Sequence, residues 1–273
     1  MITPFVLTVS NRKGGSGKTT TAVNLAAEWA NRGWRVLVVD LDTQGHAGFG
    51  LGITPLKGAA TAHDIFRDDG FDIRGAIVPC AWANLWCAPA DFLFEGTDGP
   101  KDPGRLAAQL RQPDIAARYD IIILDTPPAL DQVLVNAMSA ADGVLIPMLP
   151  HALSAEGVKQ LSRLFYRIST TSNPNLKLIG LVPIMYNARL NHHQSVVSDI
   201  ARQFGAERVM RGIRVDTKLA EAFAARQPIR ISAPRSHGAL DYFLLADELA
   251  QLWGWRRDGR AAPEPQFQKK KVS

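Results

Sequence analysis

The segment NRKGGSGKTTTAVNLAAEWA, residues 11–30, decides the fold of this chain. Its glycine-rich part, GGSGKT, follows an apolar run at residues 5–10 and precedes the apolar spacing of a helix. A strand, a glycine-rich turn and a helix in that order form a phosphate-binding loop, because the glycines let backbone N–H groups curl around phosphate oxygens at a helix N-terminus. The segment therefore predicts a nucleotide site on a β-α-β unit.

The same alternation continues along the chain. Short apolar runs rich in β-branched residues occupy residues 34–42, 119–125, 143–149 and 176–186, and helical patterns separate them. Runs that are apolar on both faces indicate a parallel sheet covered by helices on both sides. We expect an α/β protein with the three-layer P-loop NTPase fold, a mostly parallel sheet flanked by helices.

Domain organisation follows from composition along the chain. Residues 58–104 contain clusters such as RDDG and EGTDGPKDPG, which are typical of surface loops. Beyond residue 255 the sequence becomes rich in charge and proline and poor in apolar residues. We expect a single P-loop ATPase domain over residues 1–255 and a basic, flexible C-terminal tail over residues 256–273.

Composition narrows the class of protein. With 46% hydrophobic and 21% charged residues, the chain of 273 residues is typical of a globular protein, and its apolar runs are too short for a membrane span. We therefore expect a cytoplasmic protein. Cys80 and Cys87 are too few for a disulfide framework or a four-thiolate metal site, so reduced, packed thiols are expected. The net charge of +5 suits an anionic partner or a solvated basic surface equally.

The loop follows a narrower pattern than the general phosphate loop. The pattern G-x-x-x-x-G-K-S/T asks for glycine at position 12, where this chain has Arg12. The pattern K-G-G-x-G-K-T, with Lys13 directly before the glycine pair, fits without a gap and is the deviant Walker A motif. Two acidic motifs follow in order, VVDLDTQG at residues 38–45 and IIILDTPP at residues 121–128. From about residue 3 to residue 250 the chain resembles the ParA branch of the deviant Walker A ATPases, the group that also contains MinD and the nitrogenase iron protein.

The resemblance implies ATP and Mg²⁺ as cofactors and a division of labour between two lysines. Lys18 would neutralise the phosphates bound by its own subunit, whereas Lys13 would cross a dimer interface to the phosphates of the partner. Thr19 and Asp125 would hold Mg²⁺, Asp40 would support its water shell, and Asp42 would position the attacking water. The residues expected to contact the nucleotide in the loop are Gly14, Gly15, Ser16, Gly17, Lys18, Thr19 and Thr20.

Two segments of the second half resemble ParA segments near the adenine and the DNA. PIMYNARLN, residues 183–191, would place Met185 at the nucleotide, and Arg189 falls on a DNA-contact position. IRVDTKLAEAFAARQPI, residues 213–229, would place Lys218 on a second one. This position is more often arginine in the family, and a lysine keeps the charge but loses the bidentate fork of arginine.

Two further residues depart from the family pattern. Arg214 stands where proline is common, so the loop near the adenine is expected to differ. Asp131 stands where small residues are usual, in the segment that links the nucleotide to the dimer face.

The function implied by the resemblance is that of a slow, ATP-dependent switch. It would dimerise around ATP and bind nucleoid DNA without sequence preference. It would release the DNA when a ParB-like protein or cargo adaptor stimulates hydrolysis. Its cargo would be a plasmid, a chromosome origin or a protein assembly. Localisation in the cytoplasm and on the nucleoid is expected.

Three alternatives belong to other classes. A MinD-like membrane-positioning ATPase needs an amphipathic helix, and residues 243–257 are the candidate, but Asp247 and Glu248 would oppose anionic lipid, so core packing is favoured. An iron-protein-like donor needs cysteines after residues 121–128, where this chain has none. A P-loop synthetase, such as a biotin-precursor cyclase or an amide ligase, needs catalytic groups that the sequence does not identify.

Overall fold

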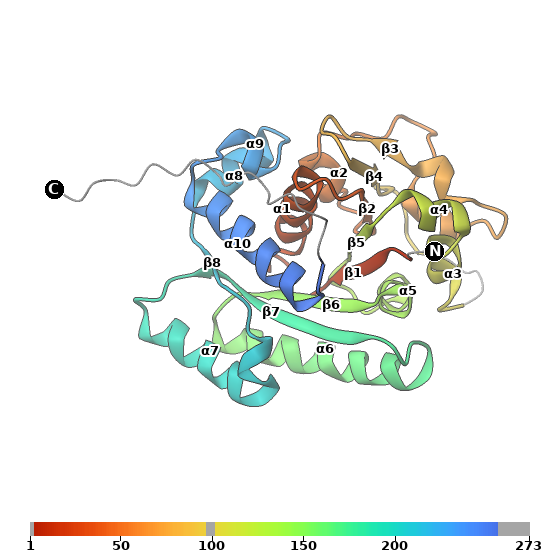
Figure 1. The fold of residues 1–273 in the computed structure, drawn as a ribbon. Coiled ribbons are helices and arrows are strands. Elements are labelled where there is room, and N and C mark those ends of the chain that lie inside the picture. The colour runs from red at the N-terminus through yellow and green to blue at the C-terminus, as the bar shows by residue number, and fades with distance from the viewer. Residues whose placement is uncertain (1–2, 97–101, 256–273) are drawn as a thin grey trace.

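A single sheet organises the computed structural model, which describes residues 3–96 and 102–255 (Figure 1). Its strands within those residues lie in the order β3-β4-β2-β5-β1-β6-β7-β8. They are β1 Phe5–Val9, β2 Val36–Asp40, β3 Val78–Pro79, β4 Leu85–Ala88, β5 Ile121–Asp125, β6 Gly143–Met148, β7 Lys177–Tyr186 and β8 Ile213–Arg214. Neighbouring strands are parallel except for the antiparallel β3–β4 pair, so the predicted mostly parallel sheet is confirmed.

Helices cover both faces of the sheet, as Figure 1 shows. One face carries α1 Lys18–Asn31, α2 His46–Gly50, α8 Thr217–Ala224, α9 Ile229–Ser232 and α10 His237–Leu252. The other carries α3 Arg105–Leu110, α4 Pro113–Arg118, α5 Gln132–Ala140, α6 Ala152–Thr171 and α7 Asn191–Phe204. Short 3-10 helices span Ala62–Phe66, Ile73–Ala76 and Ala206–Arg208. The predicted three-layer P-loop fold is confirmed.

The β2 strand shows why the sheet is buried on both sides. Val36 and Val38 belong to the core beneath α1 and α10, whereas Leu37 and Val39 belong to the core beneath α3 and α5. Successive side chains of a strand point to opposite faces, so an uninterrupted apolar run supplies both cores. The helices can therefore close over the sheet from either side.

The irregular stretch at residues 58–104 contains a strand that the sequence did not predict. Leu85–Ala88 forms β4, which pairs in parallel with β2 and buries Cys87 completely. The strand is short and lies among turn residues, so its apolar pattern is hard to see along the sequence, and its partner β2 lies far away in the chain. Both cysteines are free thiols, as expected, and burial raises the pKa of each.

The last helix packs into the core, as predicted for the segment at residues 243–257. Leu245 and Leu249 of α10 are fully buried, and Trp29 of α1 donates a 3.2 Å hydrogen bond to the Ala246 carbonyl. Asp247 forms a 2.6 Å ion pair with Arg32 of α1. Across residues 3–96 and 102–255, none of the helices combines the length and apolarity that crossing a membrane requires. The predicted tail at residues 256–273 lies outside the described residues.

Candidate nucleotide-binding site

Parallel strands bring the predicted acidic motifs to the phosphate loop. In the sheet register Asp125 of β5 stands opposite Val9 of β1 and opposite Asp40 of β2. The loop after β1, the loop after β2 and the end of β5 therefore meet at one edge. Ligands of open α/β sheets bind at this edge, outside the carboxyl ends of the strands.

The phosphate loop has the backbone of an anion cradle. Gly15 and Gly17 have φ values of 71° and 77°, a region that glycine enters without steric cost. A Cβ at Gly14 or Gly15 would meet no protein atom within 4 Å, so the loop faces open space there. Asn11 holds the start of the loop, since it donates to the Pro147 carbonyl and accepts from the Lys13 backbone N–H.

Lys18 is the buried cation of the site. It begins α1, and only 6% of its surface is exposed. Burial lowers the pKa of its ammonium group, while the nearby carboxylates of Asp125 and Asp42 oppose that shift. An anionic ligand would offset the cost of holding this charge out of water.

Thr19 and Asp125 form the predicted magnesium position. The Thr19 hydroxyl donates a 2.7 Å hydrogen bond to Oδ2 of Asp125, whose other oxygen, Oδ1, is buried without a partner among the described residues. Burial raises the pKa of Asp125 to about 7. A hydroxyl and a carboxylate oxygen are ligands that Mg²⁺ prefers, and a cation would satisfy the orphaned oxygen. The buried Ser16 hydroxyl also lacks a partner in this part of the chain, as a phosphate site requires. These residues fit Mg²⁺ and a nucleotide.

Asp40 and Asp42 take different positions after β2. Asp42 lines the pocket, and its Oδ1 accepts a 3.1 Å hydrogen bond from the Gln44 N–H. Asp40 is fully buried and accepts hydrogen bonds from the backbone N–H groups of Asp42 and Gly48. Asp40 therefore shapes the loop that presents Asp42, and its predicted place in the magnesium water shell stays a prediction.

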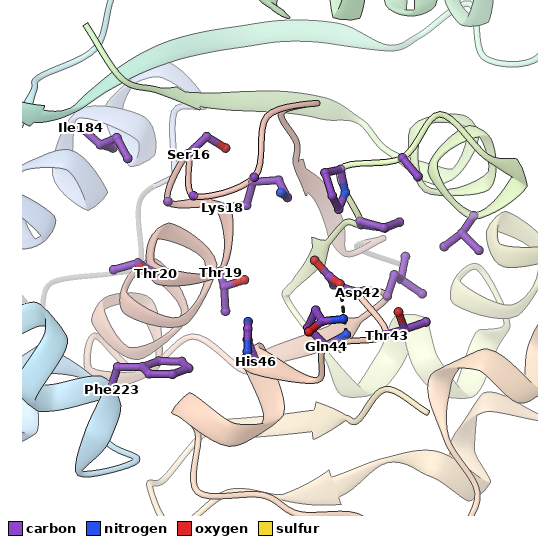
Figure 2. Close-up of a pocket in the computed structure, with 18 of the residues that line it drawn as sticks. Ser16, Lys18, Thr19, Thr20, Asp42, Thr43, Gln44, His46, Ile184 and Phe223 are labelled. Carbon is purple, nitrogen blue, oxygen red and sulfur yellow. Dashed lines mark hydrogen bonds between the residues drawn. The ribbon is translucent and has the colours of Figure 1, made fainter. Parts of the chain in front are cut away.

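The pocket is a hollow of about 1360 Å³. Figure 2 shows Ser16, Lys18, Thr19 and Asp42 around the same space, with His46 and Phe223 beyond them. The predicted residues that line it are Gly14, Gly15, Ser16, Gly17, Lys18, Thr19, Thr20, Asp42 and Met185. Lys13, Asp40 and Asp125 are not in its wall, although Asp125 reaches it through Thr19.

Met185 marks the end of β7 at the pocket. Its φ of 51° lies in the left-handed region, which is uncommon for a residue with a side chain and is found often at functional sites. The side chain is 55% exposed. Its neighbour Ile184 closes on the phosphate loop, because a Cβ at Gly17 would lie 2.6 Å from Ile184 Cδ1.

Arg189 and Lys218 lie outside the pocket, beyond the carboxyl ends of two adjacent strands. Arg189 follows β7, Lys218 follows β8, and both side chains are exposed. Lys218 forms a 2.5 Å ion pair with Glu221 on the same helix. The parallel pairing of β7 and β8 thus puts both basic residues at one edge of the sheet.

The departures from the family pattern at positions 214 and 131 both make structural contacts. Arg214 donates from its backbone N–H and its guanidinium to Asp241 of α10, whose side chain is 5% exposed. Asp131 caps α5, since its carboxylate accepts a 2.9 Å hydrogen bond from the Leu134 N–H. Both residues line the pocket, and their hydrogen bonds hold the segments around them in place.

Sequence reasoning missed a group of aromatic residues that line the pocket beside Asp42. They are His63, Phe66 and Phe94, and they come from the irregular stretch at residues 58–104. The only local signal was the Thr61–Asp64 capping box that starts the short helix at Ala62–Phe66. Nothing along the sequence connects His63 to the loop after β2.

Comparison with known proteins agrees with this geometry. Residues 5–178 match a family described as an AAA domain. The chromosome-partitioning ATPase Soj of Thermus thermophilus is 35% identical over 243 residues, which cover 89% of this chain and 94% of Soj. The chain belongs to the ParA/Soj family of ATPases. The resemblance predicted from the deviant Walker A motif is confirmed, and the family makes the chain an ATP hydrolase, as expected.

Solved structures share the fold of this ParA/Soj protein. Cobyrinic acid a,c-diamide synthase from Mycobacterium smegmatis, solved with bound ADP and magnesium, has a TM-score of 0.77 and 29% identity, covering 95% of this chain and 98% of its own. A complex of a Cyanothece McdA variant with ATP has a TM-score of 0.82 at 18% identity, covering 95% of this chain and 100% of its own. At that identity the likeness to McdA shows the fold alone.

Proposed function

We propose that this protein is a partition or positioning ATPase that dimerises around ATP, binds DNA without sequence preference in that state, and releases it after hydrolysis. ATP and Mg²⁺ are its cofactors, and the orphaned Asp125 Oδ1 and the open cradle at Gly14 and Gly15 fit them. The ATPase cycle would act in the cytoplasm and on the nucleoid. A ParB-like protein or a cargo adaptor would stimulate turnover.

Each residue of the site has a task in this cycle. Lys18 and the N–H groups of the phosphate loop hold the β- and γ-phosphates, and Thr19 with Asp125 holds Mg²⁺. Asp42 receives and orients the attacking water, because its carboxylate lies on the pocket wall near Lys18. When bound, Mg²⁺ supplies positive charge where negative charge develops during phosphoryl transfer.

The contrast between the two lysines supports a shared site most directly. Lys18 is buried in the pocket wall, whereas Lys13, five residues earlier, is half-buried and lies outside that wall. Its side chain has no carboxylate within ion-pair distance in the described residues. A second subunit that faces the pocket would bring its own Lys13 toward the phosphates, and two polyphosphates face to face need such additional cations.

Arg189 and Lys218 form the basic edge beyond β7 and β8, and this surface would bind DNA. Arg189 and Lys218 are exposed there, and a dimer would present two copies of each. Contacts of this kind neutralise phosphates without reading bases, so affinity would fall steeply with salt.

Sedimentation of matched lysine variants tests the shared site. The background is Asp42→Ala, which is expected to block hydrolysis, with saturating Mg·ATP. Lys13→Ala should bind ATP and stay monomeric, whereas Lys18→Ala should fail to bind ATP at all. Lys57→Ala, a change at an exposed lysine on the loop after α2, serves as the control and should dimerise normally. A Lys13→Ala protein that dimerises like the control would contradict the proposal.

The structural similarity to a diamide synthase supports one alternative function, that of an ATP-dependent amide ligase. Such an enzyme makes ADP only when an acid and an amine donor are present, whereas the proposed switch hydrolyses ATP alone. Phosphate release from Mg·ATP in the absence of any carboxylic acid substrate therefore separates the two.

A further inference from the structure

His63 is a fully buried histidine, and both of its ring nitrogens are engaged by main-chain groups. Nδ1 accepts a 3.0 Å hydrogen bond from the Asp91 N–H. Nε2 lies 3.2 Å from the carbonyl oxygen of Leu41. Because Nδ1 accepts, the proton of the neutral ring must be on Nε2, which donates to Leu41.

Leu41 is the residue between Asp40 and Asp42. Its N–H donates a 2.9 Å hydrogen bond to the carbonyl of Asp125, and its own carbonyl accepts from His63. The peptide group that leads into Asp42 is therefore fixed by a side chain of a different segment. In the sequence, 22 residues separate the two partners.

The histidine also contacts another residue that lines the pocket. The Phe94 ring lies 4.4 Å from the His63 ring, tilted by 31°, and Phe94 lines the pocket. The Asp91 backbone is tied to the ring, and the Asp91 carboxylate pairs with Arg67 at 2.5 Å and caps the Leu93 N–H. One side chain thus joins the loop after β2 to residues 91–94.

We propose that His63 is a positioning residue for hydrolysis, which fixes the Leu41 carbonyl and thereby the direction of Asp42 toward the reacting water. The proposal rests on the role proposed for Asp42 above. His63 does not exchange protons with the substrate, because both nitrogens are already engaged. Its contribution is to hold a group in the geometry of attack, and small displacements of such a group cost large factors in rate.

Two amide substitutions distinguish the two hydrogen bonds of His63. In glutamine the amide nitrogen stands as many bonds from Cβ as Nε2 does in histidine, so His63→Gln can keep the donor to Leu41. In asparagine the amide oxygen stands as many bonds from Cβ as Nδ1 does, so His63→Asn can keep only the acceptor for Asp91. His63→Phe removes both bonds and keeps the ring.

The experiment measures turnover, nucleotide affinity and hydrogen exchange for the three variants at pH 7.5. His63→Asn and His63→Phe should lose about tenfold or more in kcat, with Kd for ATP within about twofold, because binding groups are untouched. His63→Gln should retain kcat within about threefold. Exchange of the amides at residues 41–45 should quicken in His63→Asn and stay slow in His63→Gln.

The opposite ranking, with full turnover in His63→Asn and loss in His63→Gln, would overturn the proposal, and so would normal turnover in all three. Equal losses in both amide variants, with exchange faster throughout residues 61–66 and 91–94, would show a role in core packing only. Asp42→Ala is measured in parallel. If it hydrolyses ATP normally, the role of Asp42 fails, while exchange at residues 41–45 still tests whether His63 holds the loop.

Discussion

Thr19 in the first turn of α1 donates a 2.7 Å hydrogen bond to Asp125 at the end of β5, although 106 residues separate them. The bond joins the phosphate loop to the neighbouring strand through two groups that also suit a divalent cation. It leaves Oδ1 of Asp125 buried without a partner in the described chain. The two residues that would hold Mg²⁺ therefore lie in direct contact, where the phosphate loop meets the end of β5.

Replacing Lys18 by alanine should abolish measurable ATP binding in calorimetry. The change removes the buried ammonium expected to face the phosphates, and with it the positive charge that favours the ionised form of Asp125. Arg12→Ala, just before the loop, is the matched control: Arg12 pairs with Gln160, away from the pocket wall, and its loss should leave affinity within about threefold. Unchanged affinity in Lys18→Ala would remove Lys18 from the phosphate site.

Replacing Asp42 by alanine should leave ATP affinity nearly intact and lower kcat by about a hundredfold or more. Asp42 lies on the pocket wall, and its carboxylate accepts a hydrogen bond from the Gln44 N–H of its own loop, so the fold should tolerate the change. The ATP-bound dimer should accumulate in sedimentation. Normal phosphate release from this variant would assign the water to another residue.

Reversing the charge of Arg189 with glutamate should weaken DNA binding about tenfold or more at moderate salt, while ATP-dependent dimerisation persists. Each lost phosphate contact should also flatten the slope of log K against log salt by about 0.9. Arg118→Glu is the control. Arg118 ends α4 just before β5 and therefore lies at the amino ends of the strands, whereas Arg189 lies beyond their carboxyl ends. Equal DNA affinity in the two variants would contradict the basic edge beyond β7 and β8.

The stability of the protein should depend on pH through His63. Burial lowers the pKa of His63 from 6.5 to about 4 in the folded state. The unfolded chain therefore binds more protons than the native state between these values, and stability is lost as pH falls through that range. Between pH 7.5 and 5.0 the lost free energy of unfolding amounts to about 2 kcal/mol.

Urea unfolding of the native protein and His63→Gln at the two pH values measures this difference. The glutamine variant should lack the component that His63 contributes, because its side chain does not titrate. The same pH dependence in both proteins would mean that other groups cause the acid sensitivity.

Arg214→Ala should lower the free energy of unfolding by about 2 kcal/mol, since it leaves the Asp241 carboxylate buried without its guanidinium. Because Arg214 is partly exposed, solvent screens the ion pair, and the expected loss of unfolding free energy is smaller than for a fully buried pair. Adding Asp241→Asn to that variant should recover part of the stability, because the uncompensated charge disappears. Additive losses in this double-mutant cycle would show that the pair does not couple β8 to α10.

Much of this fold could be predicted from short patterns. The glycine loop between an apolar strand and a helix has a local physical cause, because the backbone torsions of Gly15 and Gly17 and the helix N-terminus make the cradle. The sequence also predicted parallel strands with Asp40 and Asp125 in the acidic motifs at their ends. The two residues stand opposite each other because parallel strands share their carboxyl ends. The family resemblance supplied roles for Lys13 and Lys18 that spacing alone does not explain.

By itself, the sequence determined the elements that local backbone chemistry specifies: the phosphate loop, the buried parallel strands and the acidic residues at their ends. The tertiary structure alone decided which distant groups satisfy one another. His63 meets the Leu41 carbonyl, β4 finds its place beside β2, and Arg214 finds Asp241, although no periodicity or motif links these partners. The reason is physical: a buried polar group needs a partner in space, and the sequence does not say which distant segment will provide it.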